Sequence, residues 1–347
     1  MNNNIEVDKY LKSTKIKRIL IIVFVIFLLL SFSLDISIGA GNYPLKDVLA
    51  TILDKTSISI EMEVVVWDLR LPIALMAILV GVMLSLSGAQ MQTILNNPLA
   101  DPFTLGISSA ASFGAALAII LGRGFPVPLE YLVPVNAFVF AFSTSLVLYF
   151  FTKLKGVNVE TMVLVGIALM FLFSAFVSIL QYQSDETSLQ QLVFWMMGSL
   201  GKSSWDKILI CCILLSISFP YFIAKVWSMT ALRLGDDKAR SMGVNIERLR
   251  LIMLLFISIL ASVSVAFVGV VGFIGLVAPH IARMLVGEDQ RFFLLMSGLC
   301  GALLMSITSI VSKSIIDGVI FPIGIITSLI GIPFFVSLIL ASRKRSW

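Results

Sequence analysis

The stretch 251-LIMLLFISILASVSVAFVGVVGFIGLVAPHIA-282 contains no Asp, Glu, Lys or Arg. An apolar run of about 18 or more residues without charge predicts a transmembrane helix. This run is long enough for two short spans, and Gly269, Gly272 and Pro279 favour a break inside it. Whether the run crosses the membrane once or twice fixes the number of spans, and therefore the side on which each loop lies.

The composition of the whole chain is that of a membrane protein. Hydrophobic residues make up 59% of the 347 residues, charged residues 13%, and the mean hydropathy is +1.03. A soluble domain has ~25% charged residues. Eight further runs lack charge, at 19–34, 71–100, 102–122, 131–152, 161–184, 208–224, 292–312 and 318–342. Together they predict an all-α, polytopic integral membrane protein.

Both ends of the chain are basic, which sets the parity of the spans. The N-terminal tail, 1–16, and the C-terminal tail, 342–347, carry lysine and arginine, which mark the cytoplasmic side. An even number of spans is therefore required. Splitting 251–282 gives ten spans and places 18 of the 25 Lys and Arg residues inside, against 7 outside; leaving it whole gives 14 against 11. We predict ten helices in one transmembrane domain, 17–341, between two cytoplasmic tails.

The first apolar stretch, the cysteines and the net charge are each explained by the membrane fold. The first apolar stretch resembles a signal peptide, but nine further spans favour an uncleaved first helix. The three cysteines all fall within predicted spans and are interpreted as packing residues, not as a disulfide framework or a metal site. The net charge of +5 comes mostly from the inside loops and does not imply nucleic-acid binding.

The chain shows no energy source or catalytic site of its own. No predicted span has a charged residue away from its ends, which argues against ion coupling. The single histidine, His280, cannot build a metal site alone. Residues 198–203 look like part of a phosphate loop, but Met196 stands where that motif requires glycine. A transporter of this composition would need a partner that supplies energy.

The segment 233–250 carries more charge than any other and lies between two uncharged runs. Asp236 and Arg240 suit the two ends of a short helix, Gly243 its stop, and Asn245 the cap of the next helix. Its apolar side would consist of Leu234, Ala239, Met242 and Val244. Such an element fits a groove in another protein. The alternative is a solvated amphipathic loop on the membrane surface.

Eight motifs in register, together with Gly88, resemble the permease subunits of ABC importers for iron–siderophore, haem and cobalamin, over residues 65–340. They are Leu69-Arg-Leu-Pro72, Asn97-Pro-Leu-Ala-Asp-Pro102, Leu105-Gly-Ile-Ser-Ser109, Trp195-Met-Met-Gly198, Leu234-Gly-Asp-Asp-Lys-Ala-Arg-Ser-Met-Gly-Val244, Gly272-Phe-Ile-Gly-Leu-Val-Ala-Pro-His-Ile-Ala-Arg283, Pro322-Ile-Gly-Ile-Ile-Thr327 and Gly331-Ile-Pro-Phe334.

The resemblance implies a subunit of the cell membrane that pairs as a dimer, binds two ATPase subunits on the cytoplasmic face and receives cargo from an extracytoplasmic binding protein. ATP and magnesium would bind the ATPase; no cofactor would bind this chain. The implied coupling residues are Leu234, Gly235, Asp236, Asp237, Ala239, Arg240, Gly243, Val244 and Asn245. A cytoplasmic turn is implied at Asn97, Pro98, Asp101 and Pro102.

On the outer face the sequence departs from the family pattern. The family often carries Arg-Leu-Pro-Arg at the start of span two, but Ile73 stands at the last position. Late in span nine it often carries Asp, three residues, then Arg; here these are Ser309 and Lys313. Before the Pro-Ile-Gly motif a Glu is common, and here it is Phe321. Arg70 and Lys313 stay as the predicted contacts for a binding protein.

The expected transport path is lined by span ten, the 190–200 segment and span five, where the residues are Met162, Gly166, Met170 and Phe173. Packing between helices is the alternative role for these four. The sequence leaves two other functions open, an ion-coupled secondary transporter and a membrane scaffold that transports nothing. It does not identify the cargo.

Overall fold

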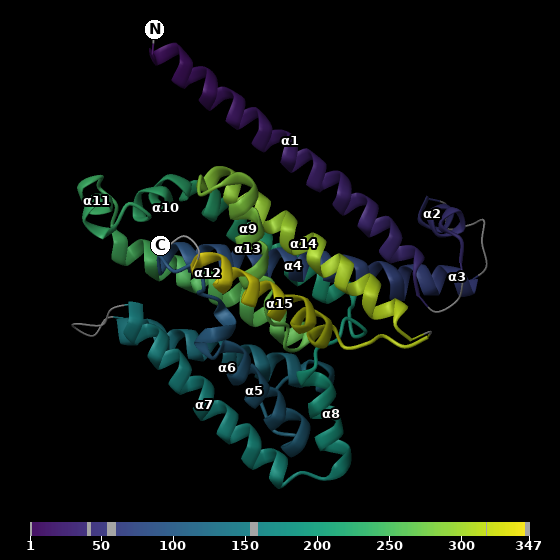
Figure 1. Cartoon of the computed structure of the whole chain (residues 1–347). Helices are drawn as coiled ribbons and strands as arrows, with labels where there is room; N and C mark the ends of the chain where they lie inside the picture. The colour runs from purple at the N-terminus through teal and green to yellow at the C-terminus, as the bar shows by residue number, and fades with distance from the viewer. Residues whose placement is uncertain (1, 40–42, 54–59, 153–158, 317, 344–347) are drawn as a thin grey trace.

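A computed structural model describes residues 2–39, 43–53, 60–152, 159–316 and 318–343, and the regular elements in these ranges are all helical (Figure 1). Ten helices correspond to the ten predicted spans. They are α1 (Asn2–Ser37), α4 (Leu71–Ile94), α5 (Ile107–Leu121), α6 (Leu129–Thr152), α7 (Val159–Tyr182), α9 (Trp205–Ala224), α12 (Ile246–Val268), α13 (Ile274–Val286), α14 (Gln290–Ser314) and α15 (Ile323–Arg343). Within the described ranges, seven are long and apolar enough to cross a bilayer, while the apolar stretches of α5, α13 and α15 (Ile107–Leu121, Ile274–Val286 and Ile323–Ser337) are shorter. The predicted fold class is confirmed.

Short helices connect these spans. They are α2 (Leu45–Leu53), α3 (Ile60–Val64), the π-helical turn η1 (Val65–Arg70), the 3-10 turn η2 (Pro102–Leu105), α8 (Glu186–Met196), α10 (Val226–Leu232) and α11 (Asp236–Ser241). α1 runs without a break from Asn2, so most of the predicted N-terminal tail continues the first span as helix. The last four residues of the predicted C-terminal tail lie outside the described part of the chain.

The run 251–282 breaks where its glycines predicted. α12 ends at Val268, and Gly269 follows with φ +76°. A Cβ at Gly269 would lie 2.3 Å from the carbonyl oxygen of Trp195, so only glycine fits this approach. Pro279, by contrast, lies inside α13 without ending it. The backbone crowding at Gly269, rather than the proline, divides the run into two spans.

α4 lies at the centre of the bundle, with α12, α13 and α14 packed around it (Figure 1). In the most apolar window of Ile60–Ile94, 72% of the residues are buried, against 17% in the window of α1. Glycines allow the backbones to touch: a Cβ at Gly81 would lie 2.3 Å from the Gly301 carbonyl oxygen, and one at Gly88 only 1.8 Å from that of Gly275. Close backbone approach of this kind holds helices together in a bilayer.

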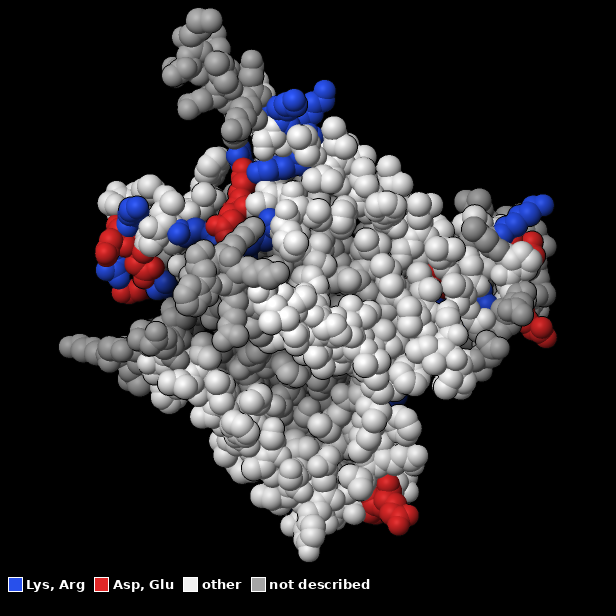
Figure 2. Space-filling model, viewed as in Figure 1, with Lys and Arg blue, Asp and Glu red and all other residues white. Residues whose placement is uncertain are grey.

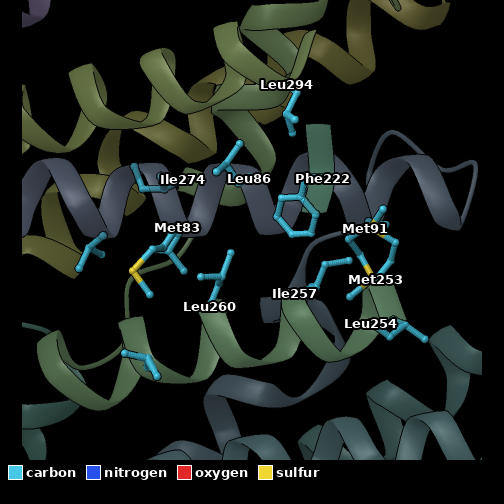
Figure 3. Close-up of a cluster of buried hydrophobic side chains, with 14 of the residues drawn as sticks. Met83, Leu86, Met91, Phe222, Met253, Leu254, Ile257, Leu260, Ile274 and Leu294 are labelled. Carbon is cyan, nitrogen blue, oxygen red and sulfur yellow. The ribbon is translucent and has the colours of Figure 1, made fainter. Parts of the chain in front are cut away.

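The interior between α4 and α12 is filled by methionine, leucine and isoleucine side chains. Figure 3 shows Met83 from α4 and Leu260 and Ile257 from α12 in the layer between the two helices, all fully or nearly fully buried. Lipid tails are as apolar as these side chains, so dense packing, rather than escape from water, stabilises the layer. This core fixes the position of both ends of α4, which border the functional regions described next.

Candidate functional site

The segment 233–250 folds as a short hinged helix followed by the start of a span. α11 occupies Asp236–Ser241 and is flanked by Gly235, with φ +102°, and Gly243, with φ +81°. No atom lies within 4 Å of a Cβ added to either glycine, so the backbone conformation alone favours glycine here. The Asn245 side chain accepts from the Arg248 amide at 3.0 Å and caps α12 as predicted. The second helix is therefore the first turns of α12, not a separate element.

The predicted apolar side of this segment is divided between two faces. Ala239 is fully buried against the bundle and Val244 is half-buried. Leu234 and Met242 keep 53% and 61% of their surface exposed. Figure 2 shows lysine, arginine, aspartate and glutamate side chains gathered over α11 at the left of the view. α11 therefore presents an exposed surface with both apolar and charged groups, as a docking element requires.

Asp236 has a partner that the sequence did not reveal. Its two carboxylate oxygens accept from Arg250 Nη1 and Nη2 at 3.0 and 2.9 Å. The exposed charges of α11 that remain for another protein are Asp237, Lys238 and Arg240. The sequence offered no signal for this pair, because position 250 lies one helix further along and on the opposite side of the Gly243 turn.

The turn after α4 is ordered by its own polar side chains. Asn97 Oδ1 accepts from the Leu99 amide at 2.9 Å, and Asp101 Oδ1 caps η2 by accepting from the Phe103 amide at 3.3 Å. Pro102 occupies the first position of η2, where its missing N–H costs nothing. A Cβ at Gly275 would lie 2.7 Å from Asp101 Oδ1, so the turn packs on the start of α13. Burial raises the pKa of Asp101 to about 6.

Three breaks in the helices meet beside this turn. The Ser199 amide donates to the Val268 carbonyl at 2.8 Å, the Ile323 amide to Gly198 at 3.1 Å, and the Gly324 amide to Met197 at 3.0 Å. The ends of α8 and α12 and the start of α15 thereby satisfy one another's backbone groups. In membrane proteins, irregular backbone of this kind is tolerated where it is buried in protein or lines a cavity.

An apolar hollow of about 350 Å³ opens at these breaks. It is bordered by the end of α8, the α12–α13 connection, η2 and α15. The lining residues are Phe103, Met196, Met197, Val270, Gly272, Phe273, Gly324, Ile325, Ser328, Leu329 and Ile332. Phe273 has φ +68°, a strained conformation for an aromatic residue, of the kind that concentrates at functional sites.

Of the predicted path residues of span five, Gly166, Met170 and Phe173 pack against other segments of the same chain. A Cβ at Gly166 would lie 2.9 Å from Leu105 Cα, and the Phe173 ring lies 5.7 Å from that of Phe113 on α5. Met170 packs beside Gly106, and the side chain of Met162 lies outside the described part of the structure. None of the three described residues lines the hollow, because the small Gly166 brings α7 onto η2. Span ten and the 190–200 segment do line it.

Arg70 and Lys313, the predicted docking residues, are both buried, with 3% and 8% of their surface exposed. The Arg70 guanidinium donates to the carbonyl oxygens of Ile36, Ser37 and Gly39 at 2.8 to 3.3 Å, where α1 ends. These terminal carbonyls lack partners in their own helix. The expectation that both charges are available at the outer surface is therefore wrong.

Lys313 pairs with an acid from another helix. Its Nζ lies 2.5 Å from Asp35 Oδ1 of α1 and donates to the Asp35 carbonyl at 2.6 Å. Ser309 Oγ also donates to Asp35 Oδ1, at 2.9 Å. Asp35 thus supplies the acidic partner that the sequence lacks at position 309. The interaction joins α1 to α14 across the fold.

The described residues contain no cluster of three or more His, Cys, Asp or Glu side chains that could hold a metal ion. The His280 ring packs edge-on against Phe334 with centroids 5.7 Å apart, in agreement with a packing role.

Comparison with known proteins identifies a family. The FecCD transport family matches residues 24–341. The haemin transport system permease HmuU of Yersinia pestis is 35% identical, covering 89% of this chain and 93% of its own length. The molybdate import system permease MolB of Haemophilus influenzae is 36% identical, covering 90% and 94%. A solved structure, described as an inward-facing conformation of a metal-chelate type ABC transporter, is 32% identical with a TM-score of 0.80, covering 93% and 99%.

Proposed function

The chain belongs to the FecCD transport family of ABC importer permeases, and from this membership we propose that it imports a bulky metal chelate: an iron siderophore, haem or cobalamin. It is a multi-pass membrane protein and not itself an ATPase; no cofactor is expected on this chain. Family membership sets aside the two alternatives, an ion-coupled secondary transporter and a scaffold without transport.

The proposed assembly places two copies of this chain side by side in the cytoplasmic membrane, with both termini inside. Two ATPase subunits dock on α11, and an extracytoplasmic binding protein docks on the opposite face. The exposed, mixed apolar and charged surface of α11 supports the first contact. Hydrolysis of ATP, with its magnesium, in the partner moves α11, and the spans alternate between outward- and inward-open arrangements.

One observation supports a chelate as cargo, and it is the apolar hollow at the three helix breaks. Its lining combines Phe103, Phe273, Met196 and Met197 with aliphatic residues of α15. Methionine adapts to irregular apolar surfaces, and aromatic side chains offer large flat contacts. A bare oxyanion would need hydrogen-bond donors, and in the described part of the chain Ser328 is the one lining residue with a polar side chain. We propose that the hollow is one subunit's share of the transport path.

The cargo can be identified through the binding protein of the same transporter. The purified binding protein is titrated with a ferric hydroxamate siderophore, haemin, cyanocobalamin and molybdate, and quenching of its fluorescence is measured. Tight binding of one of the three chelates, followed by ATP-dependent uptake of that compound in proteoliposomes, supports the proposal. Selective binding and uptake of molybdate would overturn it.

The docking of the ATPase is tested separately. Gly235→Trp places a large side chain at an exposed hinge of α11, and Arg240→Glu reverses a rim charge, so both should abolish co-purification of the ATPase. Gly122→Trp is a matched control, because Gly122 also has positive φ and open space but lies after α5, outside the segment 233–250. Normal ATPase binding and transport in both α11 variants would show that the coupling assignment is wrong.

A further inference from the structure

The last turn of α4 is held by polar contacts from three other helices. Its residues 92–94 each accept one side-chain hydrogen bond. Arg283 Nη2 of α13 donates to Gln92 Oε1 at 3.0 Å, Gln290 Nε2 of α14 to Thr93 Oγ1 at 3.3 Å, and Arg250 Nε of α12 to the Ile94 carbonyl at 3.2 Å. Ile94 ends the helix, so its carbonyl has no partner within α4 and is open to a guanidinium.

Arg250 also binds α11 with its other two nitrogens. The two N–H···O bonds to Asp236, at 3.0 and 2.9 Å, form a bidentate pair with defined orientation. The Arg250 side chain is 32% exposed and that of Asp236 43% exposed, so water screens the pair only in part. One side chain therefore joins the first residue of α11 to the last residue of α4. Lysine could not replace it, because a single ammonium cannot form the fork and reach Ile94 together.

The flexibility of α11 makes this connection important. Gly235 and Gly243 flank the helix in open space, so its ends can turn with little steric resistance. Arg233, on the bundle side of Gly235, pairs with Glu288 and does not hold α11. In the described part of the chain, Asp236–Arg250 is the only ion pair that α11 makes.

We propose that Arg250 is the positioning residue that transmits a displacement of α11 to the last turn of α4. This inference rests on the proposed function, in which the ATPase moves α11. The turn after α4 follows directly, and its Phe103 lines the apolar hollow. Movement of the end of α4 thus reaches the hollow through one short connection, while the buried body of α4 stays fixed by its glycine contacts.

The experiment uses the whole complex of permease, ATPase and binding protein in nanodiscs. Cys211, Cys212 and Cys300 are first replaced, and a single cysteine at Leu99, which is 39% exposed in the turn after α4, is labelled with bimane. Emission is compared between the nucleotide-free and the ADP–vanadate-trapped complex. With Arg250 present, trapping should shift the emission. In Arg250→Gln the ATPase should still co-purify and hydrolyse ATP, but the shift at position 99 should be lost.

Two further variants separate transmission from folding. Asp236→Asn removes the carboxylate end of the same connection and should also abolish the emission shift. The double variant Asp236→Asn/Arg250→Gln should lose no more of the shift than either single variant. Arg248→Gln is the matched control, an exposed arginine on the same turn of α12, and should keep the full shift. A full-size shift in Arg250→Gln and Asp236→Asn overturns the inference. Absence of ATPase binding in the unmutated complex would instead overturn the proposed function, and the inference with it.

Discussion

Replacing Lys313 by Met should strongly destabilise the protein, because it leaves a buried carboxylate without its counter-ion. Asp35 has no exposed surface, and Lys313 only 8%. After the substitution, the Asp35 side chain keeps the hydrogen bond from Ser309 on Oδ1, while Oδ2 has no hydrogen-bond partner among the described atoms. The ammonium that lay 2.5 Å away is gone.

The expected magnitude follows from the burial of the pair. Removing one member of a buried ion pair costs about 3–5 kcal/mol, whereas replacing both with apolar residues of similar size is often neutral or stabilising. We therefore expect Lys313→Met to lower the free energy of unfolding by about 3–5 kcal/mol. The double variant Asp35→Leu/Lys313→Met should recover most of this loss.

The assay is equilibrium unfolding of the purified chain in mixed micelles with increasing SDS, followed by circular dichroism. Arg18→Met, an exposed cation on the same helix as Asp35, serves as control and should change the unfolding free energy by less than about 0.5 kcal/mol. The reasoning fails if Lys313→Met behaves like this control, or if the double variant is as unstable as the single one.

Three further predictions concern packing, pH and capping. Gly88→Ala should destabilise the fold by about 1–3 kcal/mol or more in the same unfolding assay, because its Cβ would lie 1.8 Å from the Gly275 carbonyl oxygen. Gly298→Ala is the control and should be tolerated, because its Cβ would first meet side chains, at 3.7 Å. Folding raises the pKa of Asp101 from 3.8 to about 6, so the folded state binds this proton more tightly. Its contribution to stability is therefore present below pH 3.8 and is lost as the pH rises through about 6, by roughly 3 kcal/mol. Asp101→Asn should remove this decrease in the free energy of unfolding, measured from pH 4 to 7. An unchanged decrease in the variant would exclude Asp101 as its source. Asn245→Ala removes the cap of α12 and should cost about 1 kcal/mol, while retention of full stability would show that the bond to the Arg248 amide contributes nothing.

Local patterns in the sequence predicted the spans and the charged segment because the bilayer acts as a uniform solvent. Each span must be long, apolar and internally hydrogen-bonded, and these properties are visible in the residues themselves. The break at Gly269, the N-cap at Asn245 and the end of α11 before Gly243 are equally local, and the structure has each where it was predicted.

Contacts between distant segments were not predictable in this way. Arg250 and Ile94 are 156 residues apart, and Lys313 and Asp35 are 278 apart. Gly166 is another example, because its position in span five is compatible both with lining a transport path and with packing against a neighbouring segment. Hydropathy indicates that a helix lies in the membrane, but it does not indicate which neighbouring helix each face of it contacts.

The sequence by itself determined ten spanning helices, their order and a charged helical element between the sixth and seventh. The tertiary structure alone decided that Arg70 and Lys313 hold the end of α1 against the bundle, that an apolar hollow opens at three helix breaks, and that Arg250 connects α11 to α4. The physical reason is that polar groups withdrawn from water must find partners, and the packing of the helices decides which partners are within reach.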